Sequence, residues 1–291
     1  MALRKVVCAT DFSPASARAL KAAIAIAKQH DASLVISNAW QVPANAYGEM
    51  GIPTEVTAEM SGAAAKALEE AVVEGRAAGI RDVSSALLLG PPWQAIVEHL
   101  QQDPTIDLAV VGTHGRGGVL RVLLGSVAEQ IVRHAPCNVL AVHLKDAPPP
   151  YRSVLLPVDF SSSTPHALTA ALSIASTTLA RLALVHVVDK PFGYQGEAIG
   201  QFEQRMNRQG EDELAAFTKR TQADARIEIT GRTRLGSPSR QILEELETGP
   251  AFDLVVMGSH GRSGIRRAVL GSVAEAVIRH APCSVLVTRQ R

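Results

Sequence analysis

The chain has 291 residues, of which 46% are hydrophobic and 4% are aromatic, so it can form one large domain or two of ordinary size. Its 29 basic and 28 acidic side chains leave a formal charge of +1, which argues against broad nucleic-acid binding. Three cysteines and the lack of any run of 18 apolar residues argue against a disulfide scaffold and a membrane protein. We therefore expect a cytoplasmic protein.

Short apolar strands alternate with alanine-rich helices in the first part of the chain. In chain order, the expected strands are 6–10 (VVCAT), 33–40 (SLVISNAW), 83–90 (VSSALLLG), 107–112 (DLAVVG) and 138–144 (NVLAVHL). Segment 17–30 (ARALKAAIAIAKQH) has the apolar spacing of an amphipathic helix. Strands that alternate with helices of this length are typical of βαβ units and a parallel sheet.

The second part of the chain repeats this order. Its expected strands are 153–160 (SVLLPVDF), 182–188 (LALVHVV), 227–235 (IEITGRTRL), 253–258 (DLVVMG) and 284–288 (SVLVT). Residues 112–142 and 258–288 align at an offset of 146, with 19 of 31 positions identical. Residues 5–13 align with 153–161 at an offset of 148. The chain is therefore a duplication.

Three consecutive prolines mark the boundary between the copies, in segment 145–152. They cannot continue a strand or helix and favour an extended spacer. We expect domains at 1–147 and 151–291, joined by 145–152. The predicted fold is α/β, with two tandem doubly wound parallel five-stranded sheets of the Rossmann-like kind and helices on both faces.

Ligands of such sheets bind beyond the carboxyl ends of strands, where the strand order reverses. This rule points to Asp11 and Asp159 after the first strand of each copy, and to Gly112 and Gly258 after the fourth. The aspartates could accept hydrogen bonds from ribose hydroxyls, or could satisfy the start of the next helix. We favour the binding interpretation, since the strand end is also where the fold rule points.

Each copy carries a glycine-rich segment, GTHGRGGVLRVLLGS (112–126) and GSHGRSGIRRAVLGS (258–272). A glycine after a buried strand can take positive φ or let a ligand approach the backbone, and successive amides can form an anion-binding row. Ser126 and Ser272 are candidate N-caps, with Glu129 and Glu275 completing capping boxes and the glycine and serine amides left for a ligand. A phosphate at that helix start would meet free N–H groups. The nearby cations are Arg116, Arg121, Arg262, Arg266 and Arg267.

The spacing G-x2-G-x9-G-S resembles the signature of the ATP-binding branch of the universal stress protein family. The endings HAPCNVLAV and HAPCSVLVT are similar to the last strand of that family. The resemblance covers both copies and implies a tandem universal stress protein with the adenine nucleotide alpha hydrolase-like fold. The alternative is that each glycine-rich segment is an ordinary turn followed by a capped helix. We favour a binding site, because the two copies share more residues than a turn requires.

The resemblance also implies two sets of nucleotide-binding residues. In the first copy they are Thr10, Asp11, Ala39, Val111, Gly112, Gly115, Arg116, Gly125, Ser126 and Val127. In the second copy they are Val158, Asp159, Val187, Met257, Gly258, Gly261, Arg262, Gly271, Ser272 and Val273. The copies differ at several of these positions, so equal affinity is not expected.

Several other residues have simpler interpretations. His114 and His260 lie in the glycine loops, and we interpret them as structural because no triad is spaced to support catalysis. The H-x-x-C pairs that end in Cys137 and Cys283 resemble metal spacing, but zinc normally needs four ligands, so we expect packing and no metal. Segments 41–62 and 189–210 are either flaps over the sites or variable connections.

We therefore expect an ATP-binding stress-response regulator without an enzymatic role, binding ATP free or with Mg²⁺. The alternatives are a weak ATPase or nucleotidyl or phosphoryl transferase, and a scaffold for another ligand. No GK dipeptide is present, which excludes a Walker A loop. The resemblance implies that the two copies pack as an intramolecular pseudo-dimer and that chains can form a homodimer. No membrane or nucleic acid partner is expected.

Overall fold

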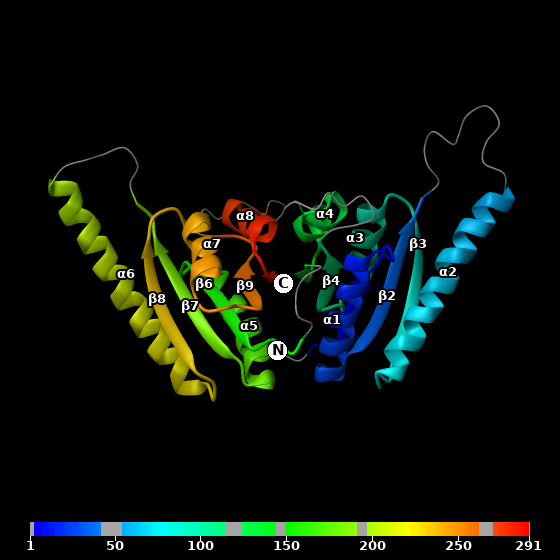
Figure 1. The fold of residues 1–291 in the computed structure, drawn as a ribbon, viewed down its shortest axis with the longest axis horizontal. Helices are drawn as coiled ribbons and strands as arrows, with labels where there is room; N and C mark the ends of the chain where they lie inside the picture. Colours follow the sequence, from blue (N-terminus) through cyan, green and yellow to red (C-terminus); the bar gives the residue numbers. More distant parts are fainter. Residues whose placement is uncertain are drawn as a thin grey trace, which may run out of the picture. The chain divides into compact units, whose positions relative to one another are not determined.

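The structure is a computed structural model that describes residues 3–41, 54–113, 124–143, 149–190, 197–261 and 270–290. It divides into two compact units, residues 2–144 and residues 145–290, which we call the first half and the second half (Figure 1).

Each half contains five strands and four helices within the described residues. In the first half these are β1 (Lys5–Ala9), α1 (Pro14–His30), β2 (Ser33–Trp40), α2 (Thr54–Ala77), β3 (Val83–Leu89), α3 (Pro92–Gln102), β4 (Leu108–Gly112), α4 (Ser126–His134) and β5 (Asn138–Val142). In the second half they are β6 (Ser153–Val158), α5 (Thr164–Thr178), β7 (Arg181–Val188), α6 (Glu197–Asp224), β8 (Ile229–Leu235), α7 (Pro238–Thr248), β9 (Leu254–Gly258), α8 (Ser272–His280) and β10 (Ser284–Thr288).

The strands of each half form a parallel sheet, with the order β3-β2-β1-β4-β5 in the first half and β8-β7-β6-β9-β10 in the second. The strand order reverses between β1 and β4, and between β6 and β9. Right-handed crossovers place the first two helices of a half on one face and the last two on the other. Figure 1 shows α2 running beside β3 and α6 beside β8. The predicted α/β fold is confirmed.

Local sequence explains the first helix and the central strands. The Ser13 hydroxyl accepts a hydrogen bond from the Ser16 N–H, Pro14 occupies the first turn, and Asp31 ends α1 in the left-handed conformation. The first four residues of β4 are all buried, as are those of β9. Continuous burial is expected for central parallel strands that helices cover on both faces.

An aspartate joins the amino ends of two strands in each half. In the first half, Asp107 accepts hydrogen bonds from the Arg4 backbone N–H at 2.7 Å and from its guanidinium at 3.0 and 3.2 Å. In the second half, Asp253 accepts from the backbone N–H groups of Arg152 and Ser153, at 2.6 and 3.1 Å. These contacts fix the strands at the edge of the sheet away from the glycine loops.

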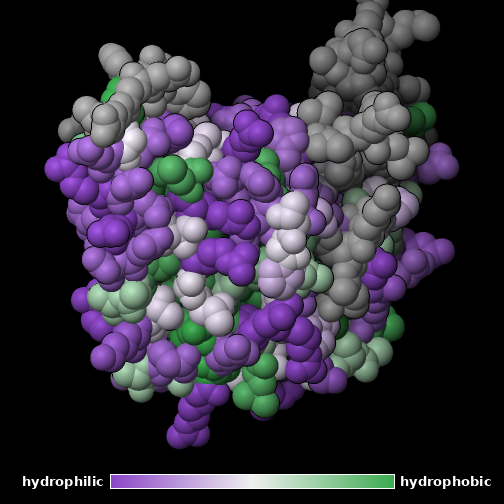
Figure 2. Space-filling view, turned by 60° about the vertical axis from the view of Figure 1, so that its left-hand side comes forward, coloured by the Kyte–Doolittle hydropathy of each residue, from purple (hydrophilic) through white to green (hydrophobic). Residues whose placement is uncertain are grey.

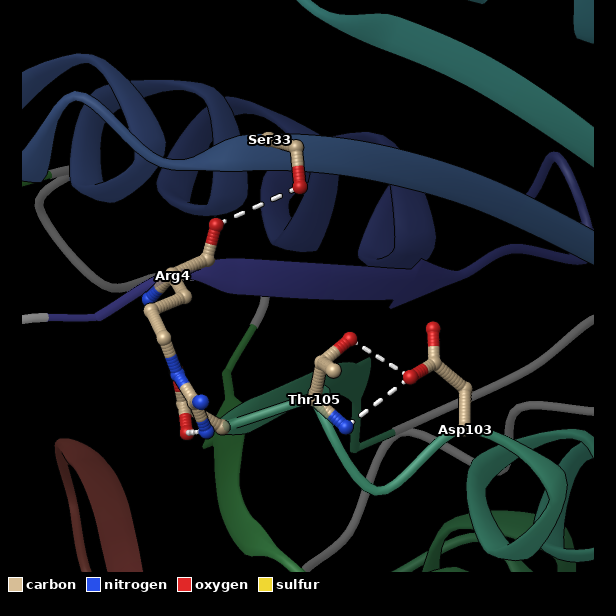
Figure 3. Close-up of polar contacts among 5 residues, drawn as sticks. Arg4, Ser33, Asp103 and Thr105 are labelled. Atoms are coloured by element: carbon tan, nitrogen blue, oxygen red, sulfur yellow. Dashed lines mark hydrogen bonds and ion pairs between the residues drawn. The ribbon is translucent and has the colours of Figure 1, made fainter.

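A second carboxylate at the same edge is held by a lysine and a threonine. Asp103 accepts from the Lys5 ammonium at 2.7 Å. It also accepts from the Thr105 N–H and hydroxyl, at 2.9 and 2.5 Å (Figure 3). These hydrogen bonds, led by the one from Lys5, hold the pKa of the Asp103 carboxyl well below its usual range.

The outer edge strands of the two halves differ in charge. On β8, Arg232 and Arg234 both pair with the buried carboxylate of Glu245, which α7 supplies. The corresponding strand β3 has the sequence VSSALLL and carries no charge. Its last residue, Leu89, is 71% exposed.

The surface and the connections differ in part from the sequence-based expectations. Helices α2 and α6 begin at Thr54 and Glu197, so the later parts of the two predicted flaps are helical, while 42–53 and 191–196 lie outside the described residues. Tyr151, in the predicted spacer, is buried. No described helix is long and apolar enough to cross a membrane. Hydrophobic residues are scattered among hydrophilic ones on the face in Figure 2.

Candidate functional site

A cavity of about 350 Å³ lies in the second half, where the strand order reverses between β6 and β9. Its volume falls within the range of small-molecule sites. The structure brings together there all nine described residues that the sequence predicts for the second site. These are Val158, Asp159, Val187, Met257, Gly258, Gly261, Gly271, Ser272 and Val273. The tenth, Arg262, lies outside the described residues.

Asp159 connects the start of α5 with the glycine loop. Its Oδ1 accepts a hydrogen bond from the Ser161 N–H at 3.0 Å and another from the Thr164 hydroxyl at 3.0 Å. Its Oδ2 would stand 2.8 Å from a Cβ at Gly261, so the carboxylate and the second motif glycine are in close proximity. Asp159 therefore both accepts hydrogen bonds at the start of α5 and lines the cavity.

The first motif glycines are needed for packing rather than for an unusual φ angle. Gly112 and Gly258 do not lie in the left-handed region. A Cβ at Gly112 would stand 2.8 to 2.9 Å from backbone atoms of Ala15 and Ser16, and one at Gly258 would stand 2.7 Å from the Ser163 Cβ. These glycines allow β4 and β9 to approach the starts of α1 and α5. The positive-φ interpretation is wrong for both.

The predicted capping boxes are also wrong. The N-caps of α4 and α8 are Gly125 and Gly271, which have no side chain to accept a hydrogen bond, and the serines that follow are already helical. Glu129 pairs with the guanidinium of Arg133 at 3.3 Å, one turn along α4.

The cap glycines bind the preceding loop through their own amides. Gly125 N–H donates to the Thr113 carbonyl at 2.6 Å, and Gly271 N–H donates to the Ser259 carbonyl at 2.9 Å. These two amides are therefore not free for a ligand, contrary to the sequence-based expectation. The amides that an α-helix leaves without an intrahelical partner are the next ones, and in the second half they belong to Ser272 and Val273.

Other cavity-lining residues were not predicted from the sequence. They include Thr164, His186, Asp189, Pro238 and Ile242. Each lies in or directly after β7, or in the first turns of α5 or α7, so the rule that ligands bind beyond the carboxyl ends of the strands could have found them. They supply a second carboxylate, an imidazole and apolar walls to the cavity.

The His186 ring is part of the wall behind Asp159. Its Nδ1 lies 2.7 Å from the Val158 carbonyl, and because a carbonyl can only accept, Nδ1 carries the proton. The ring packs against Phe160 with centroids 4.7 Å apart. Phe160 has a φ of 58°, in the left-handed region. In the first half, Asn38 makes the corresponding contact, donating to the Thr10 carbonyl at 2.7 Å.

The first half places its described site residues in a similar arrangement. Ala9 pairs with Val111 in the sheet, so Thr10 and Asp11 follow β1 beside Gly112 at the end of β4. Asp11 Oδ1 accepts from the Ser13 N–H at 3.0 Å. Ala39 lies near the end of β2, and Ser126 and Val127 begin α4 behind Gly125. Gly115 and Arg116 lie outside the described residues.

Histidines and cysteines do not form a metal centre in the described part of the chain, where no three His, Cys, Asp or Glu residues gather as ligands. His260 Nδ1 lies 2.9 Å from the Ser259 hydroxyl, and His114 is outside the described residues. His134 stacks on Trp93 with centroids 5.4 Å apart. All three cysteines are buried, and burial raises the pKa of the Cys8 thiol to about 12, so this thiol stays protonated.

Comparison with known protein families identifies both halves. The sequence model of the universal stress protein family matches residues 2–143 and again residues 150–289. The chain belongs to the universal stress protein family. It is a tandem member, since each half matches the family separately.

Relatives support this assignment over most of the chain. A universal stress protein of Mycobacterium tuberculosis is 31% identical over 238 residues, covering 78% of this chain and 75% of the relative. A putative universal stress protein of Staphylococcus aureus is 34% identical over 146 residues, covering 50% of this chain and 87% of the relative. The crystal structure of a universal stress protein from Archaeoglobus fulgidus has a TM-score of 0.75 over 100% of both chains, at 22% identity, and supports the fold.

Proposed function

We propose that this universal stress protein is a nucleotide-binding regulator that holds ATP at the carboxyl edge of the sheet in each half. The observation that carries the proposal is the cavity of the second half, which gathers the nine described residues of the predicted site. The duplicated sequence motif extends the proposal to the first half.

The chemistry of the cavity matches the parts of an adenine nucleotide. Val187 and Met257 offer apolar surface to a base, and the Asp159 carboxylate can accept hydrogen bonds from ribose hydroxyls. The amides of Ser272 and Val273 at the start of α8 suit phosphate oxygens, since a helix N-terminus favours negative charge by ~0.3–1 kcal/mol. Mg²⁺ bound to the phosphates would reduce their charge near the two carboxylates that line the cavity.

Equilibrium dialysis of the full chain against ATP tests this proposal. We expect up to two ATP molecules per chain, and reduced binding in Gly261→Val. The new side chain would start 2.8 Å from Asp159 Oδ2, so it displaces the carboxylate and fills the path of the phosphates. Gly200→Val is the matched control, because a Cβ at Gly200 in α6 meets no atom within 4 Å.

Two results would contradict this proposal. No ATP binding at millimolar concentration would reject the nucleotide role. Equal ATP binding by Gly261→Val and the parent protein would show that the glycine loop of the second half is only a turn.

We propose little or no dedicated catalysis. Efficient phosphoryl transfer needs metal ligands and a group that positions the attacking nucleophile, and the described residues hold no cluster of three metal-ligating side chains. An assay of phosphate release from ATP with Mg²⁺ should stay near the background. Turnover well above it would favour the ATPase or transferase alternative.

The predicted assembly remains a proposal. We propose that the two halves pack as an intramolecular pair and that two chains associate. Cross-linking within one chain tests the first statement. Light scattering tests the second, with a chain mass of 30.8 kDa as the reference.

A further inference from the structure

The geometry points to Thr164 as a positioning residue, which fixes the Asp159 carboxylate of the second half for a nucleotide ribose. This inference rests on the proposed function, because it concerns the same cavity. It identifies a difference between two sites that share one sequence motif.

The Thr164 hydroxyl binds the carboxylate directly. It donates to Asp159 Oδ1 at 3.0 Å, and the Ser161 N–H donates to the same oxygen at 3.0 Å. Thr164 is itself buried in the first turn of α5. Two donors on Oδ1 restrict rotation of the carboxyl group and orient Oδ2 toward Gly261.

The equivalent residue of the first half, at the offset of 148, is Ser16, and its hydroxyl points elsewhere. It accepts from the Thr10 hydroxyl at 3.0 Å and donates to the Ser13 carbonyl at 3.0 Å. All three residues are buried. The Ser16 hydroxyl is therefore held by its neighbours rather than by Asp11.

The two helices begin at different places in the alignment. The N-cap of α1 is Ser13, whereas the N-cap of α5 is Ser163, which corresponds to Ala15. The Ser16 hydroxyl donates its proton to the Ser13 carbonyl, whereas the Thr164 hydroxyl donates its proton to the Asp159 carboxylate.

A fixed carboxylate favours binding. A side chain that is already held in the bound geometry loses less conformational freedom when the ligand arrives. Asp159 Oδ1 is occupied by two protein donors, while Oδ2 is on the side of the glycine loop. We therefore expect the Thr164 contact to strengthen binding of the ribose in the second half.

The two halves can be observed separately in the full chain. Both tryptophans, Trp40 and Trp93, belong to the first half. Trp40 directly follows Ala39, so tryptophan fluorescence reports ATP binding in the first half. Equilibrium dialysis reports total binding, and the difference gives the second half.

The decisive variant is Thr164→Val, which should weaken ATP binding in the second half by about three- to tenfold, the usual effect of one hydrogen bond. Thr164→Ser should restore the affinity, because the hydroxyl is retained. Discrimination between ATP and 2′-deoxy-ATP should fall in Thr164→Val, since Asp159 is then less well placed for the ribose. Thr169→Val is the matched control on the same helix, because its hydroxyl binds the Pro165 carbonyl at 2.9 Å and is exposed.

Thr164 also lines the cavity, so a direct ligand contact must be distinguished from positioning. In an Asp159→Asn background, Thr164→Val should cause little further loss of affinity, because the residue acts through the carboxylate. An equal loss in both backgrounds would overturn the positioning role.

Thr164→Ala gives an independent test in case Thr164→Val does not fold. It removes the same hydroxyl without adding a bulky side chain, and it should weaken ATP binding in the second half. Unchanged ATP binding in Thr164→Ala would overturn the inference while ATP binding itself remains. Absence of ATP binding in both halves would instead reject the proposed function and this inference with it.

Discussion

Aspartates at opposite ends of the strands have different tasks. At the amino ends, Asp107 and Asp253 accept hydrogen bonds from backbone N–H groups and fix the start of β1 and β6. At the carboxyl ends, Asp11 and Asp159 accept from the N–H two residues later and also lie where the strand order reverses. Aspartate residues thus stabilise the sheet at one edge and lie at the candidate site at the other.

Asp103 gives the stability of the first half a defined pH dependence. Its folded-state pKa is lowered, so the carboxylate contributes stability above its unfolded pKa, and this contribution is lost as the pH falls through the folded pKa. Asp103→Asn should therefore lower the free energy of unfolding at pH 7 by less than about 1 kcal/mol, because the ion pair is partly exposed. The difference from the parent should shrink below about pH 4.

Urea unfolding curves across the acid range measure this effect. Glu211→Gln on α6 serves as the control, since Glu211 is exposed and pairs only with the Asn207 amide in the contacts described here. A difference between Asp103→Asn and the parent that grows toward acid pH would contradict the sign of the expected dependence.

At the scale of elements, the approach of strand to helix explains the glycine that ends β4. Gly112→Ala should lower the free energy of unfolding by about 1–3 kcal/mol, the usual range for overpacking a tight contact. The new Cβ would stand 2.8 to 2.9 Å from backbone atoms of α1, which cannot rotate away. Thermal melts of the full chain can measure the loss.

Gly62→Ala is the matched control for this substitution. Gly62 lies within α2, and a Cβ there meets no atom within 4 Å. Alanine should therefore stabilise the helix by up to about 1 kcal/mol. Similar effects of the two substitutions would mean that the contact between β4 and α1 is not tight.

The elements and the site differ in how far the sequence determines them. Apolar runs predict β4 and β9 well, because a central parallel strand must be apolar on both faces. The role of Gly112 was not predictable, since the clash involves Ala15, which is distant in sequence. The N-caps were misassigned because Gly125 can cap through its own backbone when its ψ is 142°, without a serine hydroxyl.

The hydroxyl contacts in the candidate site also required the structure. Ser16 and Thr164 occupy equivalent positions in the sequence, but their hydroxyls bind different partners. The two helices begin two residues apart in the alignment, at N-caps Ser13 and Ser163, and hydrogen-bond geometry cannot be read from the order of residues.

At the scale of the whole molecule, the duplication gives one chain two candidate sites, which we propose to be unequal. A ligand stabilises a folded unit according to its concentration relative to the dissociation constant. ATP should therefore raise the unfolding temperatures of the two halves to different extents. Calorimetry follows both halves and tryptophan fluorescence follows the first, because both tryptophans belong to it, so the two methods should show shifts that depend differently on ATP concentration. Identical shifts by both methods at every ATP concentration would contradict unequal sites.

The uncharged edge strand of the first half, β3, affects how readily the protein aggregates during storage. Natural sheets commonly protect such edges with charged side chains, as Arg232 and Arg234 do on β8, while β3 ends in exposed leucine. When the chain is concentrated or held near its melting temperature, precipitation should begin from β3. Shelf life would then depend on a strand remote from the glycine motif, and arginine at the exposed positions Leu87 and Leu89 would extend it.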